Sequence, residues 1–280
     1  MSAEVNILLI ECPDELGIIA RVTTVLTNHK LNMVEFHEFA DEETGQFYMR
    51  TGVTGKLDRA KVEKDIASVL PTGASFRFVN NKRKKVVIMV TKETHCLGDL
   101  LLRHYTNNID MDILGVIGNH PDCKELTEKF KIPWFEISHK GIERSEHERL
   151  IVDKIKELGP DYILLAKFMR ILSPEFVAEF PNRIINIHHS FLPSFIGANP
   201  YRQAYNRGVK IIGATAHIVN NDLDEGPIIY QDVTRVDHSH SAVEMSRAGR
   251  DVEKNVFTQG IKLVLKDRVF VKNNRTIVFA

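Results

Sequence analysis

An amide and an imidazole stand two residues apart at the end of an apolar run, Ile184-Ile185-Asn186-Ile187-His188. Residues i and i+2 of a strand point to the same face, so we expect the side chains of Asn186 and His188 to project together beyond the strand end. A hydrogen-bond donor beside a titratable ring suits chemistry at a carbonyl group. The residues alone leave a second interpretation equally open, in which Asn186 caps a turn and His188 is packed in the core.

A second segment, residues 221–227, could add a carboxylate to this pair. It reads Asn-Asp-Leu-Asp-Glu-Gly-Pro and contains Asp224. An aspartate just before Gly and Pro is more often a turn former than a base, and His217 is equally unremarkable by itself. Because 36 positions separate Asp224 from His188, the sequence does not say whether the two side chains meet.

Composition narrows the class of protein. The chain has 280 residues, enough for two domains, and its 37 basic and 37 acidic residues give a formal net charge of zero, which argues against a nucleic-acid-binding protein. Cys12, Cys96 and Cys123 are few and far apart, so we expect no disulfide framework and a reducing, cytoplasmic location. No signal peptide is evident, and no apolar run approaches the roughly 20 residues that span a bilayer, so we expect no membrane segment.

The first part of the chain, residues 1–81, is predicted to form a small α/β domain. Alternating and helical patterns of apolar residues predict strand, helix, strand, strand, helix and strand, in that order, at 6–10, 18–26, 34–38, 47–53, 62–70 and 76–79. This βαββαβ order is the ferredoxin-like pattern. The basic stretch 82–85 is interpreted as a solvated linker and not as an anion contact, because the run of cations is short.

The second part, residues 86–280, is predicted to form a doubly wound, mostly parallel sheet. Strands are expected at 86–90, 112–117, 134–137, 162–166, 184–187, 211–219 and 227–236, and helices at 146–158 and 242–265, with a closing hairpin at 269–279. Ser173-Pro174 has the features of a helix start, with Ser as N-cap and Pro at the first position. Sites in such sheets lie beyond the carboxyl ends of the strands, where Asn186 and His188 are placed.

Three motifs in this part resemble the folate-dependent formyltransferase domain. They are Leu-Leu-Ala-Lys-Phe-Met-Arg-Ile-Leu-Ser at 164–173, Asn-Ile-His-His-Ser-Phe within 184–194, and the stretch from Ala216-His217 to Pro227. The resemblance covers residues 84 to 280, and the first part is similar to an ACT domain, a small regulatory module. Together they resemble the formyltetrahydrofolate deformylase family, which hydrolyses 10-formyltetrahydrofolate to formate and tetrahydrofolate, supplying formate for purine biosynthesis and balancing one-carbon pools.

The resemblance implies roles for individual residues. It makes Asn186, His188 and Asp224 the catalytic residues. It implies that the folate is bound by Met169, Arg170, Leu172, His189, His217, Asp222 and Gly226. Without the motif, Met169 and Leu172 would be interpreted as core residues. Neither a metal nor a cofactor is expected, since the substrate is the folate itself and the His and Asp residues lack a zinc motif such as His-Glu-x-x-His.

Two departures from the transferase pattern favour water as the acceptor. The stretch 91–99 after the first catalytic-domain strand has one Gly and the acids Glu93 and Asp99, a poor cradle for a phosphate. Transferases tend to have Pro where this chain has His189, whose polar ring would either position water or be structural. We therefore expect hydrolysis, with formyl transfer to an amine as the alternative. Burial would raise the pKa of Asp224 and a protonated His188 would lower it, so we expect the two groups to titrate as a coupled pair.

The ACT resemblance implies regulation by a small amino acid such as glycine or methionine. The implied binding residues are Asp14, Gly17 and Asn32, often shared between two subunits, so a homo-oligomer is expected. Backbone N–H groups at the helix start after Gly17 would suit a carboxylate. From the residues alone, Gly17 is a turn residue and Asn32 a helix C-cap.

Overall fold

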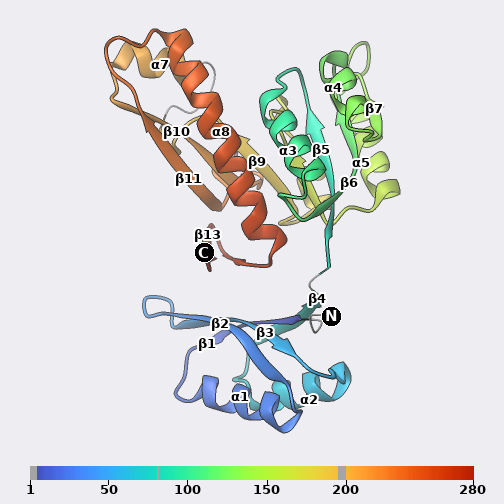
Figure 1. Cartoon of the computed structure of the whole chain (residues 1–280), viewed down its shortest axis with the longest axis vertical. Coiled ribbons are helices and arrows are strands. Elements are labelled where there is room, and N and C mark those ends of the chain that lie inside the picture. Colours follow the sequence, from blue (N-terminus) through green and yellow to red (C-terminus); the bar gives the residue numbers. More distant parts are fainter. Residues whose placement is uncertain (1–4, 81, 195–199) are drawn as a thin grey trace. The chain divides into compact units, whose positions relative to one another are not determined.

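The computed structural model describes residues 5–80, 82–194 and 200–280 (Figure 1). The chain divides into two compact units. The first unit contains Met1–Lys82 together with Lys266–Phe270 and Phe279–Ala280, and the second contains Arg83–Leu265 together with Val271–Val278. The last fifteen positions of the chain are therefore divided between both units, which the sequence did not suggest.

The first unit has the predicted βαββαβ order. Its elements are β1 (Asn6–Pro13), α1 (Ile18–Asn28), β2 (Asn32–Asp41), β3 (Gln46–Thr54), α2 (Arg59–Val69) and β4 (Ser75–Asn80). In the described part of this unit, four strands form an antiparallel sheet in the order β2-β3-β1-β4. Figure 1 shows α1 and α2 on one face of this sheet. The ferredoxin-like prediction is confirmed.

Strand β3 is buried on both faces. The helices bury one face through an apolar cluster that includes Leu8 and Met49. On the other face Tyr48 makes an edge contact with Phe270, with ring centroids 5.6 Å apart. Arg50, which is 4% exposed, donates from Nε to the carbonyl oxygen of Asp267 (3.1 Å) and from Nη2 to that of Lys266 (3.0 Å). The C-terminal residues thus complete the first unit.

The second unit is an α/β domain. Its elements up to the long helix are β5 (Lys84–Val90), α3 (His95–Tyr105), β6 (Met111–Gly118), a 3-10 turn (Pro121–Cys123), α4 (Lys124–Lys129), β7 (Trp134–Glu136), α5 (Arg144–Leu158), β8 (Tyr162–Leu165), α6 (Pro174–Glu179), β9 (Ile184–His188), α7 (Pro200–Arg207), β10 (Ile211–Ile218), β11 (Ile228–Arg235) and α8 (Ala242–Leu265). A short hairpin follows, formed by β12 (Val269–Lys272) and β13 (Arg275–Val278).

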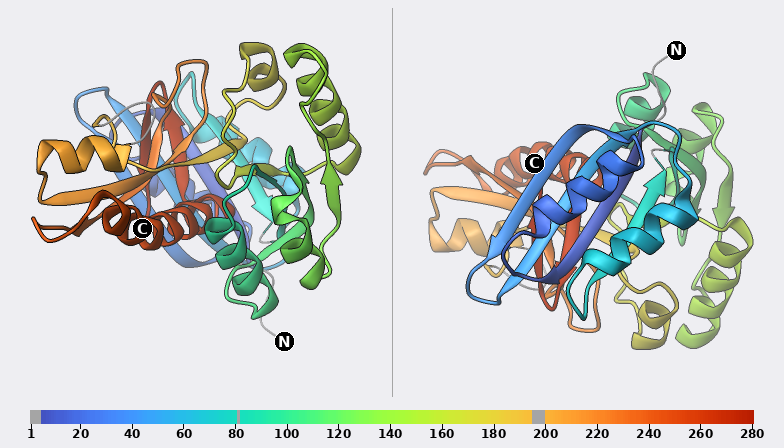
Figure 2. Two further views of the ribbon diagram at one scale, coloured as in Figure 1. Left: turned by 90° about the horizontal axis from the view of Figure 1, so that it is seen from above. Right: turned by 90° about the horizontal axis from the view of Figure 1, so that it is seen from below.

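Seven strands of the described residues form the sheet of this unit, in the order β11-β10-β9-β8-β5-β6-β7. Neighbours from β9 to β7 are parallel, whereas β10 runs antiparallel to both β9 and β11. The central strand β5 has no exposed surface from Val86 to Val90, as a strand covered on both faces requires. Figure 2 shows α3 and α8 on one side of the sheet and α5 and α6 on the other. The prediction of a doubly wound, mostly parallel sheet is confirmed.

Two local predictions are wrong. Strand β5 begins at Lys84, so the second half of the predicted linker 82–85 is strand. Arg83 is not simply solvated, because its Nε lies 3.1 Å from both Asp110 Oδ1 and Asp112 Oδ1. Asn32 does not cap a helix: α1 ends at Asn28 with His29 as C-cap, and Asn32 is the first residue of β2.

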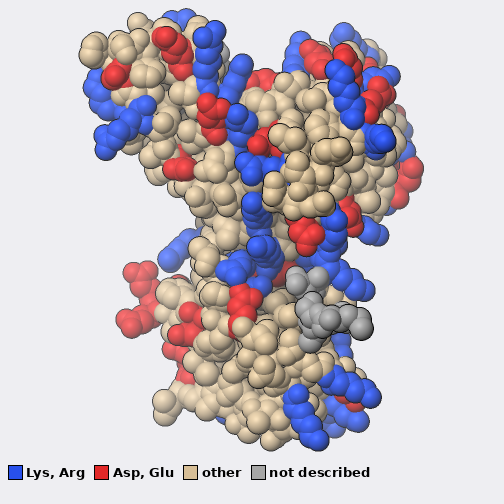
Figure 3. Space-filling view, viewed as in Figure 1, with Lys and Arg blue, Asp and Glu red and all other residues tan. Residues whose placement is uncertain are grey.

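Other local predictions are confirmed. Ser173 is the N-cap of α6, since its hydroxyl accepts a hydrogen bond from the Phe176 N–H (3.2 Å), and Pro174 stands at the first helical position. On the face drawn in Figure 3, each unit carries both basic and acidic side chains, in keeping with the net charge of zero. Among the described residues, no helix is both long and apolar enough to span a bilayer.

Candidate active site

Strand β9 places Asn186 and His188 on one face, as the two-residue spacing predicts. Strand β10 pairs antiparallel with β9 and sets His217 opposite Asn186. The Nδ2 atom of Asn186 lies 3.1 Å from Nε2 of His217. This edge of the sheet lies near the switch point between β8 and β5, where the connections after the two strands diverge and leave a crevice.

The hydrogen bonds of His217 orient the amide of Asn186. Burial lowers the pKa of His217, so its ring is neutral at neutral pH. Its Nδ1 lies 3.1 Å from the carbonyl oxygen of Ile218, which can only accept, so Nδ1 carries the proton. Nε2 of His217 is then an acceptor, and the Asn186 amide donates one N–H to it. Among the described residues, the second N–H of this amide has no acceptor.

Asp224 joins this pair from the loop between β10 and β11. Its Oδ1 lies 3.2 Å from His188 Nδ1 and 3.8 Å from His217 Nε2. Burial acts to raise the pKa of Asp224, but the hydrogen bond to His188 and the nearby imidazoles outweigh burial and hold this pKa below its ordinary value. Asp224 is therefore a carboxylate at neutral pH, in contact with His188, to which the sequence could not connect it.

The loop that carries Asp224 depends on a glycine. A Cβ atom at Gly226 would lie 1.8 Å from the carbonyl oxygen of Ile218, so only glycine allows the loop to lie against the end of β10. The Nδ2 atom of Asn274 donates to the carbonyl oxygen of Glu225 (2.7 Å) and holds the loop from the other side. Asp224 itself has a φ of 58°. The loop is thus fixed on both sides of the carboxylate.

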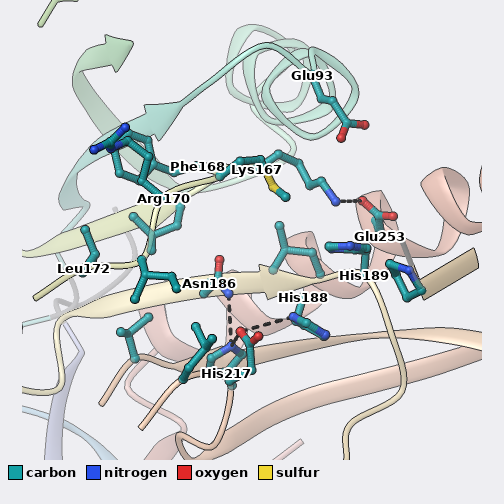
Figure 4. Close-up of a pocket in the computed structure, with 18 of the residues that line it drawn as sticks. Glu93, Lys167, Phe168, Arg170, Leu172, Asn186, His188, His189, His217 and Glu253 are labelled. Atoms are coloured by element: carbon teal, nitrogen blue, oxygen red, sulfur yellow. Dashed lines mark hydrogen bonds and ion pairs between the residues drawn. The ribbon is translucent and has the colours of Figure 1, made fainter. Parts of the chain in front are cut away.

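These side chains line one pocket of about 590 Å³ (Figure 4). The predicted site residues among its lining are Met169, Arg170, Leu172, Asn186, His188, His189, His217, Asp222 and Asp224. Gly226 does not line the pocket, but it allows the loop that carries Asp224 to lie against the end of β10. Met169 is 55% exposed, so it is a wall residue and not a core residue, whereas Leu172 packs partly against the apolar cluster under β8.

The sequence did not point to a second charged cluster on the wall of this pocket. Glu253 of α8 is 1% exposed and Lys167, after β8, is 3% exposed. Oε2 of Glu253 lies 3.2 Å from Lys167 Nζ and 2.8 Å from His95 Nε2, and Oε1 accepts from the Tyr201 hydroxyl (2.5 Å). Two signals could have found the cluster: Lys167 interrupts an apolar run, and Glu253 shares a helix face with the apolar Val256.

The charge of Glu253 is balanced inside the protein. Burial acts to raise its pKa, but the His95 hydrogen bond, the Lys167 charge and the Tyr201 hydrogen bond lower this pKa to about 2. Among the described residues, His95, Cys96 and Glu253 also bring potential metal-ligand atoms within 4.8 Å of one another. Burial raises the pKa of the Cys96 thiol well above its ordinary value, which opposes thiolate ligation, and Lys167 already supplies the cation at Glu253. The expectation of a site without metal stays a prediction.

The residues predicted to bind a regulatory amino acid, Asp14, Gly17 and Asn32, do not lie together within one chain. Asp14 follows the end of β1 that pairs with Gln46, whereas Asn32 pairs with Thr54 at the other end of β3. Gly17, predicted to be a turn residue, is the N-cap of α1 with a φ of 85°. The 11 residues of α1 separate Gly17 from Asn32 by about 16 Å at 1.5 Å per residue.

Two family models match the chain. The formyl transferase model matches residues 84–261 and the ACT domain model residues 6–71. The fold and the site define the class of protein as an α/β enzyme of the formyl transferase fold that carries an ACT domain.

Relatives make the assignment narrower. A formyltetrahydrofolate deformylase of Haemophilus influenzae is 53% identical over 275 residues, covering 98% of this chain and 99% of the relative. One of Escherichia coli (strain K12) is 54% identical over 95% of each chain. The crystal structure of a formyltetrahydrofolate deformylase from Pseudomonas syringae pv. tomato superposes with a TM-score of 0.95 at 38% identity, covering 100% of this chain and 96% of that one. The chain belongs to the formyltetrahydrofolate deformylase family.

Gly226→Ala should reduce turnover on the order of 100-fold, because the new Cβ must push the loop and Asp224 away from His188. Steady-state formate release measures the effect. Gly98→Ala in α3 is the matched control, since its Cβ would meet only Leu126 at 3.7 Å. Equal activity of the two variants would contradict the positioning role of Gly226.

Glu253→Gln should lower the free energy of unfolding at neutral pH by about 3 to 5 kcal/mol, because the buried Lys167 loses its carboxylate partner. The pKa of Glu253 is lowered from 4.5 to about 2 in the folded chain, so its contribution is present above 4.5 and is lost as the pH falls toward 2. Urea unfolding of both proteins between neutral pH and pH 3 should show the difference narrowing below 4.5.

The matched control for this variant is Glu128→Gln, an exposed change in α4 that should stay within about 0.5 kcal/mol of the wild type. A stability difference between the wild type and Glu253→Gln that is constant over the same pH range would show that the Glu253 charge does not contribute.

Proposed function

We propose that this chain hydrolyses 10-formyltetrahydrofolate to formate and tetrahydrofolate, with Asn186, His188 and Asp224 as its catalytic residues. The observation that carries the proposal is the 3.2 Å contact between Asp224 and His188 at the end of β9, beside an Asn186 N–H that no described residue accepts. It is supported by deformylase relatives that cover 98% of the chain at 53% identity. No cofactor enters the scheme, because the folate supplies the formyl group.

The folate binds in the 590 Å³ pocket. The exposed apolar side chains of Met169 and Ile171, 55% and 58% exposed, offer flat cover to a pterin ring. Leu172 and Leu223 add apolar walls, and backbone groups of the loop from Asp222 to Gly226 are available to the polar edge of the ring. Arg170 and His189 also line the pocket (Figure 4).

The formyl oxygen is held by two donors as negative charge develops on it. One is the Asn186 N–H that does not bond to His217. The other is Nε2 of His188, which is buried and has no hydrogen-bond partner among the described residues. When Nε2 carries a proton, it donates to the same oxygen, and Asp224 on Nδ1 stabilises the charged ring. Such preorganised donors favour the transition state over the planar substrate.

Asp224 moves the proton. Its carboxylate takes a proton from the attacking water as the water oxygen forms a bond to the formyl carbon. The bond from this carbon to N10 of the folate then breaks, and N10 receives the proton that Asp224 took. Formate and tetrahydrofolate are the products, and the carboxylate is regenerated.

Water is favoured over a phosphorylated amine as the acceptor. Glu93 lines the pocket, and its carboxylate would repel a phosphate. His189 is stacked on His188, with ring centroids 5.1 Å apart. Burial, followed by the Lys167 charge, lowers the pKa of His189 to about 4, so the neutral ring can accept a hydrogen bond from water.

We further propose that the ACT domain binds a small amino acid, glycine or methionine, between two copies of the chain in a cytoplasmic homo-oligomer. Asp14 and Gly17 lie at the opposite end of the module from Asn32, so a second chain must supply the missing side of a shared site. Strand β2 is the edge of its sheet and exposes the apolar residues Met33, Val34, Phe36 and Phe39. An apolar edge of this kind favours pairing with another copy.

Wild-type protein given 10-formyltetrahydrofolate alone should release formate, and Asp224→Asn should release it 10²- to 10⁴-fold more slowly, because the proton acceptor is lost. The control is Glu225→Gln, an acid-to-amide change at the exposed neighbouring position. Tetrahydrofolate should bind all three proteins alike. Formate release by Asp224→Asn at the wild-type rate would refute the assignment, and wild-type turnover that requires an added amine would identify a transferase instead.

Isothermal titration of the intact protein with a panel of amino acids should detect binding of glycine or methionine. Asn32→Ala should weaken the binding at least about tenfold, a loss of one good hydrogen bond to a charged group. Asn80→Ala, an exposed asparagine at the end of β4, is the control. No heat with any amino acid would remove the effector proposal and leave the hydrolysis untouched.

A further inference from the structure

The buried ion pair of Lys167 and Glu253 has no role in the chemistry of Asn186, His188 and Asp224, yet both residues line the same pocket. Their charged atoms lie 3.2 Å apart, and both side chains are almost fully buried. Burying two charges costs free energy, and a pair of apolar residues would fill the same volume at no such cost. The pair therefore calls for a function beyond packing.

The backbone conformation of Lys167 also indicates a function beyond packing. Its φ of 63° lies in the left-handed region, which disfavours every residue with a Cβ. A glycine at this position would be unstrained. The chain instead retains a long cationic side chain at a strained position on the pocket wall, an arrangement typical of functional sites.

Tyr201 ties the pair to α8. A Cβ at Gly249 would lie 2.1 Å from the Tyr201 hydroxyl, so the glycine one turn before Glu253 lets the tyrosine lie against the helix and reach the carboxylate. The Tyr201 ring in turn stands 6.2 Å from the ring of His189. Figure 4 shows His189 between His188 and Glu253, with the Lys167 side chain directed at Glu253. His189 thus separates the catalytic residues from the ion pair.

We propose that the ion pair of Lys167 and Glu253 makes water the acceptor of the formyl group, by filling the part of the pocket beyond His189 and by holding His189 in place to position the attacking water. Lys167 and Glu253 are positioning and specificity residues in this scheme, and the inference rests on the hydrolysis proposed above. Water oxygen bonds to the formyl carbon, Asp224 takes its proton, and the carbon–N10 bond breaks as N10 is protonated. An amine in place of water would follow the same steps and leave as an N-formyl amine.

The physical reason for the selection is volume. The Glu253 carboxylate neutralises the Lys167 ammonium, so the pair acts through the space that it fills and not through a net charge. The side chains of Lys167, Tyr201 and His189 leave less room for the substituent that an amine carries. Water has no substituent, and the neutral His189 ring can accept one of its hydrogens.

The test compares Lys167→Gly with the wild type, given 10-formyltetrahydrofolate with and without glycinamide, a small primary amine. Glycine suits the φ of 63°, so the variant relieves strain. Its kcat for formate should fall at least about tenfold, and the ratio of N-formylglycinamide to formate should rise at least about tenfold over the wild type. The dissociation constant of tetrahydrofolate should change by less than about threefold, since the pterin wall is intact.

Lys131→Gly is the matched control, because Lys131 also has a positive φ, 59°, but is exposed after α4, and it should behave as the wild type. The double variant Lys167→Gly with Glu253→Gln leaves no unpaired buried charge, and it should show the same change in product ratio if the single variant is poorly folded. An unchanged product ratio in a folded variant, or parallel loss of turnover and tetrahydrofolate binding in both variants, would overturn the inference. Wild-type protein that releases no formate without an amine would instead overturn the hydrolysis itself.

Discussion

The contact between Asp224 and His188 is the interaction on which the site depends. It joins the end of β9 to a loop far away in the sequence, and both groups leave water to make it. Three features support this contact: the close approach of Gly226 to the end of β10, the hydrogen bond from Asn274 to the loop, and the antiparallel pairing that puts His217 beside the carboxylate. The imidazoles lower the pKa of Asp224 despite its burial, so the contact keeps the carboxylate ionised.

The pocket contains two buried carboxylates, each balanced by its own partners. Asp224 has His188, and Glu253 has Lys167, His95 and Tyr201. Neither carboxylate is left unpaired, which would cost several kcal/mol. His189 lies between these two centres and is neutral because burial and the Lys167 charge both oppose its protonation. One pocket therefore presents an ionised carboxylate, which can accept a proton from water, close to an uncharged ring, which can accept a hydrogen bond from the same water.

Patterns within a few residues predicted most of the fold and half of the site. The two-residue period of a strand was enough to place Asn186 and His188 on one face, and the apolar periods predicted the element order of both units. Local patterns do not predict contacts between distant segments. Asp224 reaches His188 only because its loop folds back against the end of β10, and Glu253, the partner of Lys167, is on a helix that begins 75 positions after Lys167. The prediction that Asn32 caps a helix is wrong for a related reason, because the residue type alone does not show that α1 ends at Asn28 and that Asn32 already pairs with Thr54 in the sheet.

The distribution of the last residues between the two units has a consequence for the order of synthesis. The first unit is made first, but its buried Arg50 finds its acceptors on Lys266 and Asp267, and Tyr48 packs against Phe270. Nη1 of Arg50 lies 2.8 Å from Glu35 Oε2 within the first part of the chain, but until residues 266 and 267 have left the ribosome its Nε and Nη2 have to stay hydrated or lack a partner. The amino-terminal module is therefore completed last, and a chain that stops at the end of α8 would lack part of its first domain as well as its tail.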